Sequence, residues 1–299
     1  MRLILFSVVV LFSCGGCVAV EFEEFWMDHP ATQDPALRNP DVLTSTKAPV
    51  DDVEKDLPVL VMVNGFSGST YSFEELTQEA ERRGVLTSNV LLGGHGESIE
   101  AWTQTTWQDW SAPLVDELRA LDDAGYINIH VLAYSTGATL LFQAMAEDSF
   151  ADLRPWRSII AVSPLVLPLD KELYNLRNGG QLCGNFPVTG LTDDEKARYY
   201  VNRPFEAMNQ LLSIVETFEA SLAAKIAVPE QTEVILLQGT DDVAVDPLGP
   251  GLLNNGLSAS FEPAWLDTKR HGFLRTKGRD DLDDNDILTQ EHAFSLIFN

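Results

Sequence analysis

The segment Ala133-Tyr134-Ser135-Thr136-Gly137 places a serine between small residues, where an apolar stretch ends and a helical pattern begins. A serine hydroxyl is a poor nucleophile at neutral pH unless a base accepts its proton and a third group orients that base. A tight strand-to-helix turn exposes such a serine, and small residues two positions to either side keep the turn free of clashes. Ser135 is therefore the predicted nucleophile. The alternative is an ordinary strand-end turn whose serine caps the helix.

The acid and the base are expected later in the chain, in that order. Gly239, Asp242 and Val245, directly after an apolar stretch, resemble the Gly-x-x-Asp-x-x-Val turn of the α/β-hydrolases, and this resemblance implies that Asp242 is the acid. Asp241 is the neighbour most easily confused with it. His271 follows a predicted strand around Trp265, in a segment that resembles the histidine loop of the same family, and it is therefore the predicted base.

The other four histidines fit structural positions better than a catalytic one. His95 lies in a Gly-His-Gly turn after a predicted strand, and His130 lies inside a strand. His292 has helical spacing with neighbouring leucines, so we expect it to pack against the domain. His29 precedes the predicted folded domain.

Together these motifs resemble the α/β-hydrolase superfamily, and within it the serine carboxylesterase, monoacylglycerol lipase and lysophospholipase group, which includes serine aminopeptidase-type hydrolases. The resemblance covers about residues 57–299. Asn64-Gly65-Phe66-Ser67-Gly68 resembles the family's His-Gly-Phe-x-Gly, with Asn64 in place of the usual histidine. The resemblance implies an oxyanion hole made by the backbone N–H groups of Phe66 and Thr136. It implies no metal and no organic cofactor.

The function implied by the resemblance is cleavage of carboxylic esters through an acyl-enzyme. The small-molecule substrate would be an ester or a lipid, such as a monoacylglycerol or a lysophospholipid. Peptidases and thioesterases share the fold and the triad, so they remain alternatives. A non-catalytic envelope lipoprotein that uses the fold as a binding module is the other alternative.

The elements that must position these residues alternate between strand and helix. A continuous apolar stretch from Pro58 to Val63 is typical of a strand buried on both faces. Ser72 and Glu75 predict a capping box at the start of the first helix. The expected strands are 58–63, 85–92, 127–133, 158–162 and 234–237, and the expected helices are 72–83, 106–124, 138–146 and 286–298. This order predicts an α/β-hydrolase fold, with a mostly parallel central sheet flanked by helices.

Residues 164–230 interrupt the alternation and are too long for a simple connection. They contain two predicted helices, 193–200 and 206–224, which we interpret as a helical cap insertion over the carboxyl edge of the sheet. The residues expected to contact substrate are Tyr134, Tyr199, Phe205 and Met208. The alternative is that the apolar residues of the insertion form its own core.

The chain has 299 residues with 45 acidic and 20 basic side chains, so its formal net charge is −25. Nucleic-acid binders need basic side chains to displace counterions from phosphates, so this charge excludes that class. A further acidic cluster, 280–286, fits either a calcium site or a solvated loop whose last acids favour the next helix N-terminus.

The first residues predict export. One basic residue followed by about ten apolar residues is typical of a signal peptide, whereas a membrane span needs roughly 20. Residues 1–16 resemble a lipoprotein-type signal peptide, with Cys14 as the lipidation site and Cys17 as the alternative. Residues 17–56 are rich in X-Pro pairs and predict an irregular tether. The expected location is the bacterial cell envelope, with a lipid anchor in the membrane; the alternative is a soluble periplasmic or secreted protein.

Overall fold

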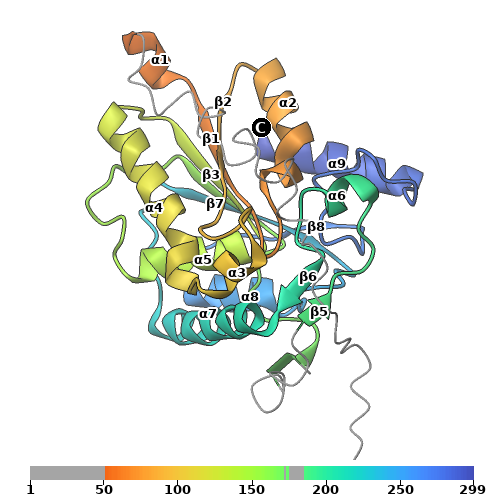
Figure 1. The fold of residues 1–299 in the computed structure, drawn as a ribbon. Coiled ribbons are helices and arrows are strands. Elements are labelled where there is room, and N and C mark those ends of the chain that lie inside the picture. Colours follow the sequence, from red (N-terminus) through yellow and green to blue (C-terminus); the bar gives the residue numbers. More distant parts are fainter. Residues whose placement is uncertain (1–50, 172, 175–184) are drawn as a thin grey trace, which may run out of the picture.

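A single parallel sheet forms the centre of the computed structural model, which describes residues 51–171, 173–174 and 185–299 (Figure 1). The order of its strands is β2-β1-β3-β4-β7-β8, and every neighbouring pair is parallel. The strands are β1 (Val59–Val63), β2 (Leu86–Val90), β3 (Ile129–Tyr134), β4 (Ser158–Val162), β7 (Glu233–Gly239) and β8 (Ala264–Leu266). The expected fold class, a parallel sheet flanked by helices, is confirmed.

Alternate side chains of each strand point to opposite faces of this sheet. Because both sets are apolar, helices cover both faces and bury them. Val59, Val61 and Val63 of β1 lie in one apolar core, and Leu60 and Met62 lie in the other. The first core is shared with α4 (Trp107–Ala124), α5 (Thr136–Ala146), α7 (Phe205–Ala224) and α8 (Gly249–Gly256). The second core is shared with α2 (Glu74–Arg82) and α9 (Asp284–Ile297). All of β1 is buried, as its continuous apolar pattern predicts.

The insertion between β4 and β7 divides into two parts. Its first part contains β5 (Asn185–Pro187), α6 (Asp193–Lys196) and β6 (Asn202–Pro204), with β5 and β6 paired antiparallel. Its second part is α7, whose Phe218 ring stacks on Phe142 of α5. Helix α7 therefore belongs to the helical layer on one face of the sheet, and it also lies near the ends of the strands (Figure 1).

The remaining short elements lie at the strand ends. They are α1 (Asp52–Asp56), a 3-10 helix (Thr70–Phe73) and α3 (Ile99–Thr103). Within the described ranges, no helix is both long enough and apolar enough to cross a bilayer. The predicted signal peptide and residues 17–50 of the predicted tether, with Cys14 and Cys17, lie outside the described residues and stay predictions. Residues 51–56 of that tether are described, and they form α1, whose Glu54 accepts a hydrogen bond from the Tyr126 hydroxyl at 2.8 Å.

Two local predictions are wrong. Ser72 does not cap α2, because its hydroxyl pairs with the Tyr199 hydroxyl at 3.0 Å and the chain enters α2 through the 3-10 helix. Glu75 instead accepts hydrogen bonds from the backbone N–H groups of Thr276 and Lys277. His292 was expected to pack against the domain, but it is exposed on α9.

Candidate active site

Ser135 lies at the sharp turn between β3 and α5. Its backbone has φ 54° and ψ −119°, which holds the residue in a sparsely populated conformation. The Ser135 N–H donates to the carbonyl of Val162 at 2.9 Å, which ties the turn to β4. A Cβ added at Gly137 would lie 2.6 Å from the carbonyl oxygen of Asn64, so only glycine fits here. These constraints raise the serine above the ends of the strands.

His271 and Asp242 complete a continuous chain of hydrogen bonds with Ser135. The Nε2 atom of His271 lies 2.8 Å from the Ser135 Oγ atom. The Nδ1 atom of His271 lies 2.9 Å and 3.0 Å from the two carboxylate oxygens of Asp242. The structure thus brings together three side chains that are as much as 136 positions apart in the sequence. Asp241, the alternative acid, is exposed and is not part of this chain.

The Asp242 carboxylate is buried, with 5% of the residue exposed. Burial acts to raise the pKa of this carboxyl, but hydrogen bonds from His271 and from the N–H groups of Ala244 and Val245 outweigh it. The pKa therefore lies below its ordinary value, and Asp242 is ionised at neutral pH. An ionised acceptor at Nδ1 keeps the His271 proton on Nδ1 and leaves Nε2 free to accept a proton from Ser135.

The loop after β1 lies against the serine turn. A Cβ added at Gly65 would lie 3.0 Å from the Ser135 Cβ atom. Asn64, which replaces the expected histidine, is buried; its Oδ1 accepts from the Leu92 N–H and its Nδ2 donates to the Gly65 carbonyl. Across residues 51–171, 173–174 and 185–299, neither the Phe66 nor the Thr136 N–H has a hydrogen-bond acceptor. Unpaired N–H groups beside a nucleophilic serine are what an oxyanion site requires.

His95 holds this loop in place. Its Nε2 accepts from the Ser67 N–H at 3.4 Å, and its Nδ1 contacts the Gly93 carbonyl at 3.2 Å. Burial lowers the pKa of His95 to about 4, so the ring is neutral at physiological pH. Rings of Phe66, Trp102 and others enclose it. His95 therefore has the structural position that its Gly-His-Gly turn predicts.

A cavity of about 660 Å³ opens above Ser135 and His271. Three of the four residues expected to contact substrate, namely Tyr134, Tyr199 and Met208, line it. The Tyr134 ring lies 5.0 Å from the His271 ring, and burial raises the pKa of both tyrosine hydroxyls, so both are neutral. Phe205, the first residue of α7, was expected in this lining but lies outside it; the residues of α7 that line the cavity are Met208 and Leu211.

Comparisons with known proteins agree with this geometry. No family model matches the chain. A thermostable monoacylglycerol lipase from Bacillus sp. (strain H-257) is 22% identical over 205 residues, which cover 67% of this chain and 77% of that protein. A structure from a study of two metagenome-derived lipolytic enzymes superposes with a TM-score of 0.62 at 22% identity, covering 81% of this chain and 94% of that one. A soluble variant of monoglyceride lipase from Saccharomyces cerevisiae has a TM-score of 0.61 at 13% identity, with 84% and 89% covered.

The chain has the α/β-hydrolase fold. The strand order, the sharp turn at Ser135 between β3 and α5 and the position of Asp242 after β7 agree with this fold. The acidic cluster 280–286 leads into a helix start, since Asp283 caps α9 and Asp286 completes a capping box. Asp281 and Asp286 also pair with Arg270, which precedes His271. Among the described residues, no group of three potential ligand side chains could hold a metal ion.

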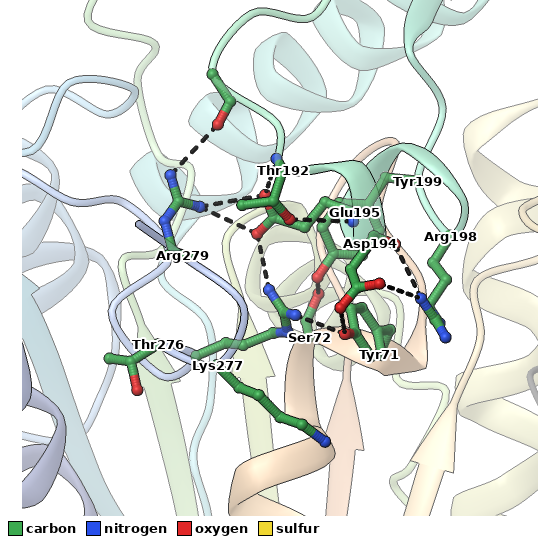
Figure 2. A network of polar contacts seen from close by, with 12 residues as sticks. Tyr71, Ser72, Thr192, Asp194, Glu195, Arg198, Tyr199, Thr276, Lys277 and Arg279 are labelled. Carbon is green, nitrogen blue, oxygen red and sulfur yellow. Dashed lines mark hydrogen bonds and ion pairs between the residues drawn. The ribbon is translucent and has the colours of Figure 1, made fainter. Parts of the chain in front are cut away.

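A buried ion-pair network, which the sequence did not predict, joins the insertion between β4 and β7 to the segment after His271 (Figure 2). The Glu195 carboxylate of α6 accepts from Arg275 and Arg279, each at 3.0 Å. Arg275 also donates to the Tyr71 hydroxyl at 2.6 Å. The paired side chains of Glu195 and Arg275 are only 6% and 4% exposed. No local sequence motif predicts this ion pair, because Glu195 and Arg275 lie 80 positions apart.

Glu195→Gln is expected to lower the free energy of unfolding by about 3 kcal/mol, because it leaves the buried Arg275 guanidinium without a counter-charge. The measurement is the urea midpoint at constant slope. Asp194→Asn is the matched control. Asp194 is 58% exposed and pairs with Arg198 at the surface, so its loss should cost under about 1 kcal/mol. Equal shifts for the two variants would contradict a buried anchoring pair at Glu195.

Proposed function

We propose that this protein is a serine hydrolase that cleaves carboxylic esters through an acyl-enzyme. One observation carries the proposal: an unbroken Ser135–His271–Asp242 hydrogen-bond chain that faces a cavity. The lipolytic relatives named above support the ester as the bond that is cleaved. Ser135 would be the nucleophile, His271 the general base and Asp242 the orienting acid.

In the acylation step, the Ser135 Oγ attacks the ester carbonyl carbon while His271 Nε2 takes the hydroxyl proton. The negative charge that develops on the carbonyl oxygen is stabilised by the N–H groups of Phe66 and Thr136. Asp242 stabilises the imidazolium through its two contacts with Nδ1. His271 then gives its proton to the departing alkoxide, the alcohol leaves, and the acyl group stays on Ser135.

In the deacylation step, a water molecule enters beside His271 Nε2 and loses a proton to it while attacking the acyl carbonyl. The tetrahedral intermediate collapses, Ser135 recovers its proton from His271, and the acid is released. The same oxyanion site serves both steps, so no further residue is needed.

Monoacylglycerols and similar single-chain esters are the substrates that the relatives suggest, and the cavity volume suits one chain. Peptidase and thioesterase activities are the competing assignments for the same triad. A series of p-nitrophenyl esters of increasing chain length, run beside aminoacyl amides and acyl thioesters, separates the three. Hydrolysis of amides alone would overturn the ester assignment.

A fluorophosphonate probe is expected to label the wild-type protein at Ser135, because the probe reacts with a serine whose proton is taken by a neighbouring base. Mass spectrometry of the labelled peptide locates the adduct, and loss of signal in Ser135→Ala assigns it. A well-folded wild-type protein that is not labelled would favour a non-catalytic binding module.

A further inference from the structure

The cavity above Ser135 has the opposite charge balance to the rest of the chain. The whole protein has 45 acidic and 20 basic residues. The cavity lining contains two carboxylates, Asp170 and Glu195. Its basic lining residues are Arg203, Lys269, Arg270, Arg275 and Arg279. An anionic ligand would need one of these cations that no carboxylate of the protein already neutralises.

Carboxylates inside the protein already neutralise three of these five cations. Arg270 pairs with Asp281 and Asp286. Arg275 and Arg279 share Glu195, and Arg279 also pairs with Asp281. These three guanidinium groups therefore hold loops of the protein together and have their charge already balanced. Lys269 is exposed at the surface, which leaves Arg203 as the cation to explain.

Arg203 lies in β6 and reaches over the loop that contains the predicted oxyanion donor. Its Nε donates to the Ser67 hydroxyl at 3.2 Å, and its guanidinium lies 5.6 Å from the centre of the Phe66 ring. Among the described residues, no carboxylate lies within ion-pair distance of Arg203. Burial lowers the pKa of this guanidinium, with nearby Tyr134 acting in the opposite direction. An arginine nevertheless stays protonated at neutral pH.

Arg203 is partly buried, and a charge that is partly removed from water without a charged partner carries a cost that a bound anion would reduce. The guanidinium is a planar fork that matches two oxygens of a carboxylate or a phosphate. At Arg203 only the Nε side of the fork is used by a side chain of the described protein, namely Ser67. Arg203 lines the same cavity as Ser135. Its two terminal nitrogens are therefore the groups that could bind an anion there.

We propose that Arg203 binds an anionic oxygen group, carboxylate or phosphate, on the ester substrate, so that the enzyme prefers charged esters over neutral ones of the same size. The proposal rests on the proposed function, because it names the substrate class of that same site. The proposed substrate is an anionic ester, whereas a monoacylglycerol is a neutral one. Arg203 would be a specificity residue that holds the substrate beside the loop of Phe66, without taking part in proton transfer.

Two matched substrate pairs test the proposal and separate the sources of the anion. The p-nitrophenyl monoester of glutaric acid, set against p-nitrophenyl hexanoate, places a carboxylate on the acyl side. Monooleoylglycerol phosphate, set against monooleoylglycerol, places a phosphate on the alcohol side. The readout is the ratio of kcat/KM for the charged ester to that for the neutral one. We expect a ratio above one in the wild type for at least one pair.

Arg203→Met removes the charge and keeps the apolar stem, so the ratio for the preferred pair should fall about 10- to 100-fold. Arg203→Lys keeps the charge and should retain part of the preference. Lys269→Met, an exposed cation on the same cavity, is the control, and its ratio should change far less. If Arg203→Met does not fold, the ratios of wild type and Arg203→Lys decide.

The failures are distinguishable. A wild-type ratio at or below one for both pairs, or a ratio unchanged in Arg203→Met, overturns the anion site and leaves the proposed function standing. Such a result would make Arg203 a structural support for the Ser67 loop. No hydrolysis of any of the four esters, together with no fluorophosphonate labelling, overturns the proposed function itself.

Discussion

Ser135→Ala is expected to lower kcat for ester hydrolysis by about 10⁶-fold, which is the scale of loss when the nucleophile of a serine triad is removed. The reason is geometric, because the His271 Nε2 atom contacts the Ser135 hydroxyl at 2.8 Å and alanine leaves it no hydroxyl to deprotonate. The measurement is kcat with a p-nitrophenyl ester under single-turnover and steady-state conditions. The cavity and the oxyanion loop should survive, so substrate binding should change far less than kcat.

Ser163→Ala is the matched control for this result. Ser163 follows β4, the strand beside β3; it is buried, and its hydroxyl has no partner among the described residues. Its replacement should leave kcat close to the wild-type value. The double variant Ser135→Ala/His271→Ala should be no slower than Ser135→Ala, because residues that act as a unit lose their effect together. Additive losses would contradict a shared function of the two residues.

The layers of the fold were predictable because each strand and each long helix carries its own local pattern. The apolar stretch before Asn64 is buried on both faces, and α4 buries Trp107, Trp110 and Leu114, which recur at helical spacing. The three side chains of the hydrogen-bonded chain, Ser135, Asp242 and His271, could also be selected from the sequence, because each lies in a short motif next to a strand end. Chain order along a parallel sheet then brings these motifs to one edge.

The failed and missed features depend on contacts between distant segments. The Ser72 hydroxyl was predicted from nearby residues to cap a helix, but it forms a hydrogen bond with Tyr199, which is 127 positions away. The Glu195–Arg275 pair and the Arg203–Ser67 contact join the insertion to loops of the sheet. Neither has a periodicity or a motif, so only the three-dimensional arrangement discloses them. His292 had helical spacing with leucines, yet the face of α9 that carries it is turned to solvent.

Asp242→Asn is the second large effect, with kcat expected to fall by about 10⁴-fold through the wrong histidine tautomer. The Oδ1 atom of Asp242 accepts from the N–H groups of Ala244 and Val245, so an asparagine would place its carbonyl oxygen there. Its amide nitrogen would then face His271 Nδ1 and donate to it. That contact moves the ring proton to Nε2, where it points at Ser135 and removes the base.

Gln238 can supply a hydrogen-bond acceptor for the amide group of this asparagine. The Gln238 Nε2 donates to the second Asp242 oxygen at 3.3 Å, while its own Oε1 has no partner in the described structure. Rotation of the Gln238 amide would present Oε1 to the new NH₂ group, so the variant should fold. Asp241→Asn, at the exposed neighbouring position, is the control and should leave kcat nearly unchanged.

The pH dependence of stability gives an independent check on the same carboxylate. The pKa of Asp242 is lowered in the folded protein, so its contribution to stability is present above the unfolded value of about 3.9 and is lost as pH falls through the folded value. The difference in unfolding free energy between wild type and Asp242→Asn should therefore shrink as the pH is lowered through that window. If the difference is flat with pH while kcat is unaffected, Asp242 is not the ionised partner of His271, and the acid must be sought elsewhere on the same edge of the sheet.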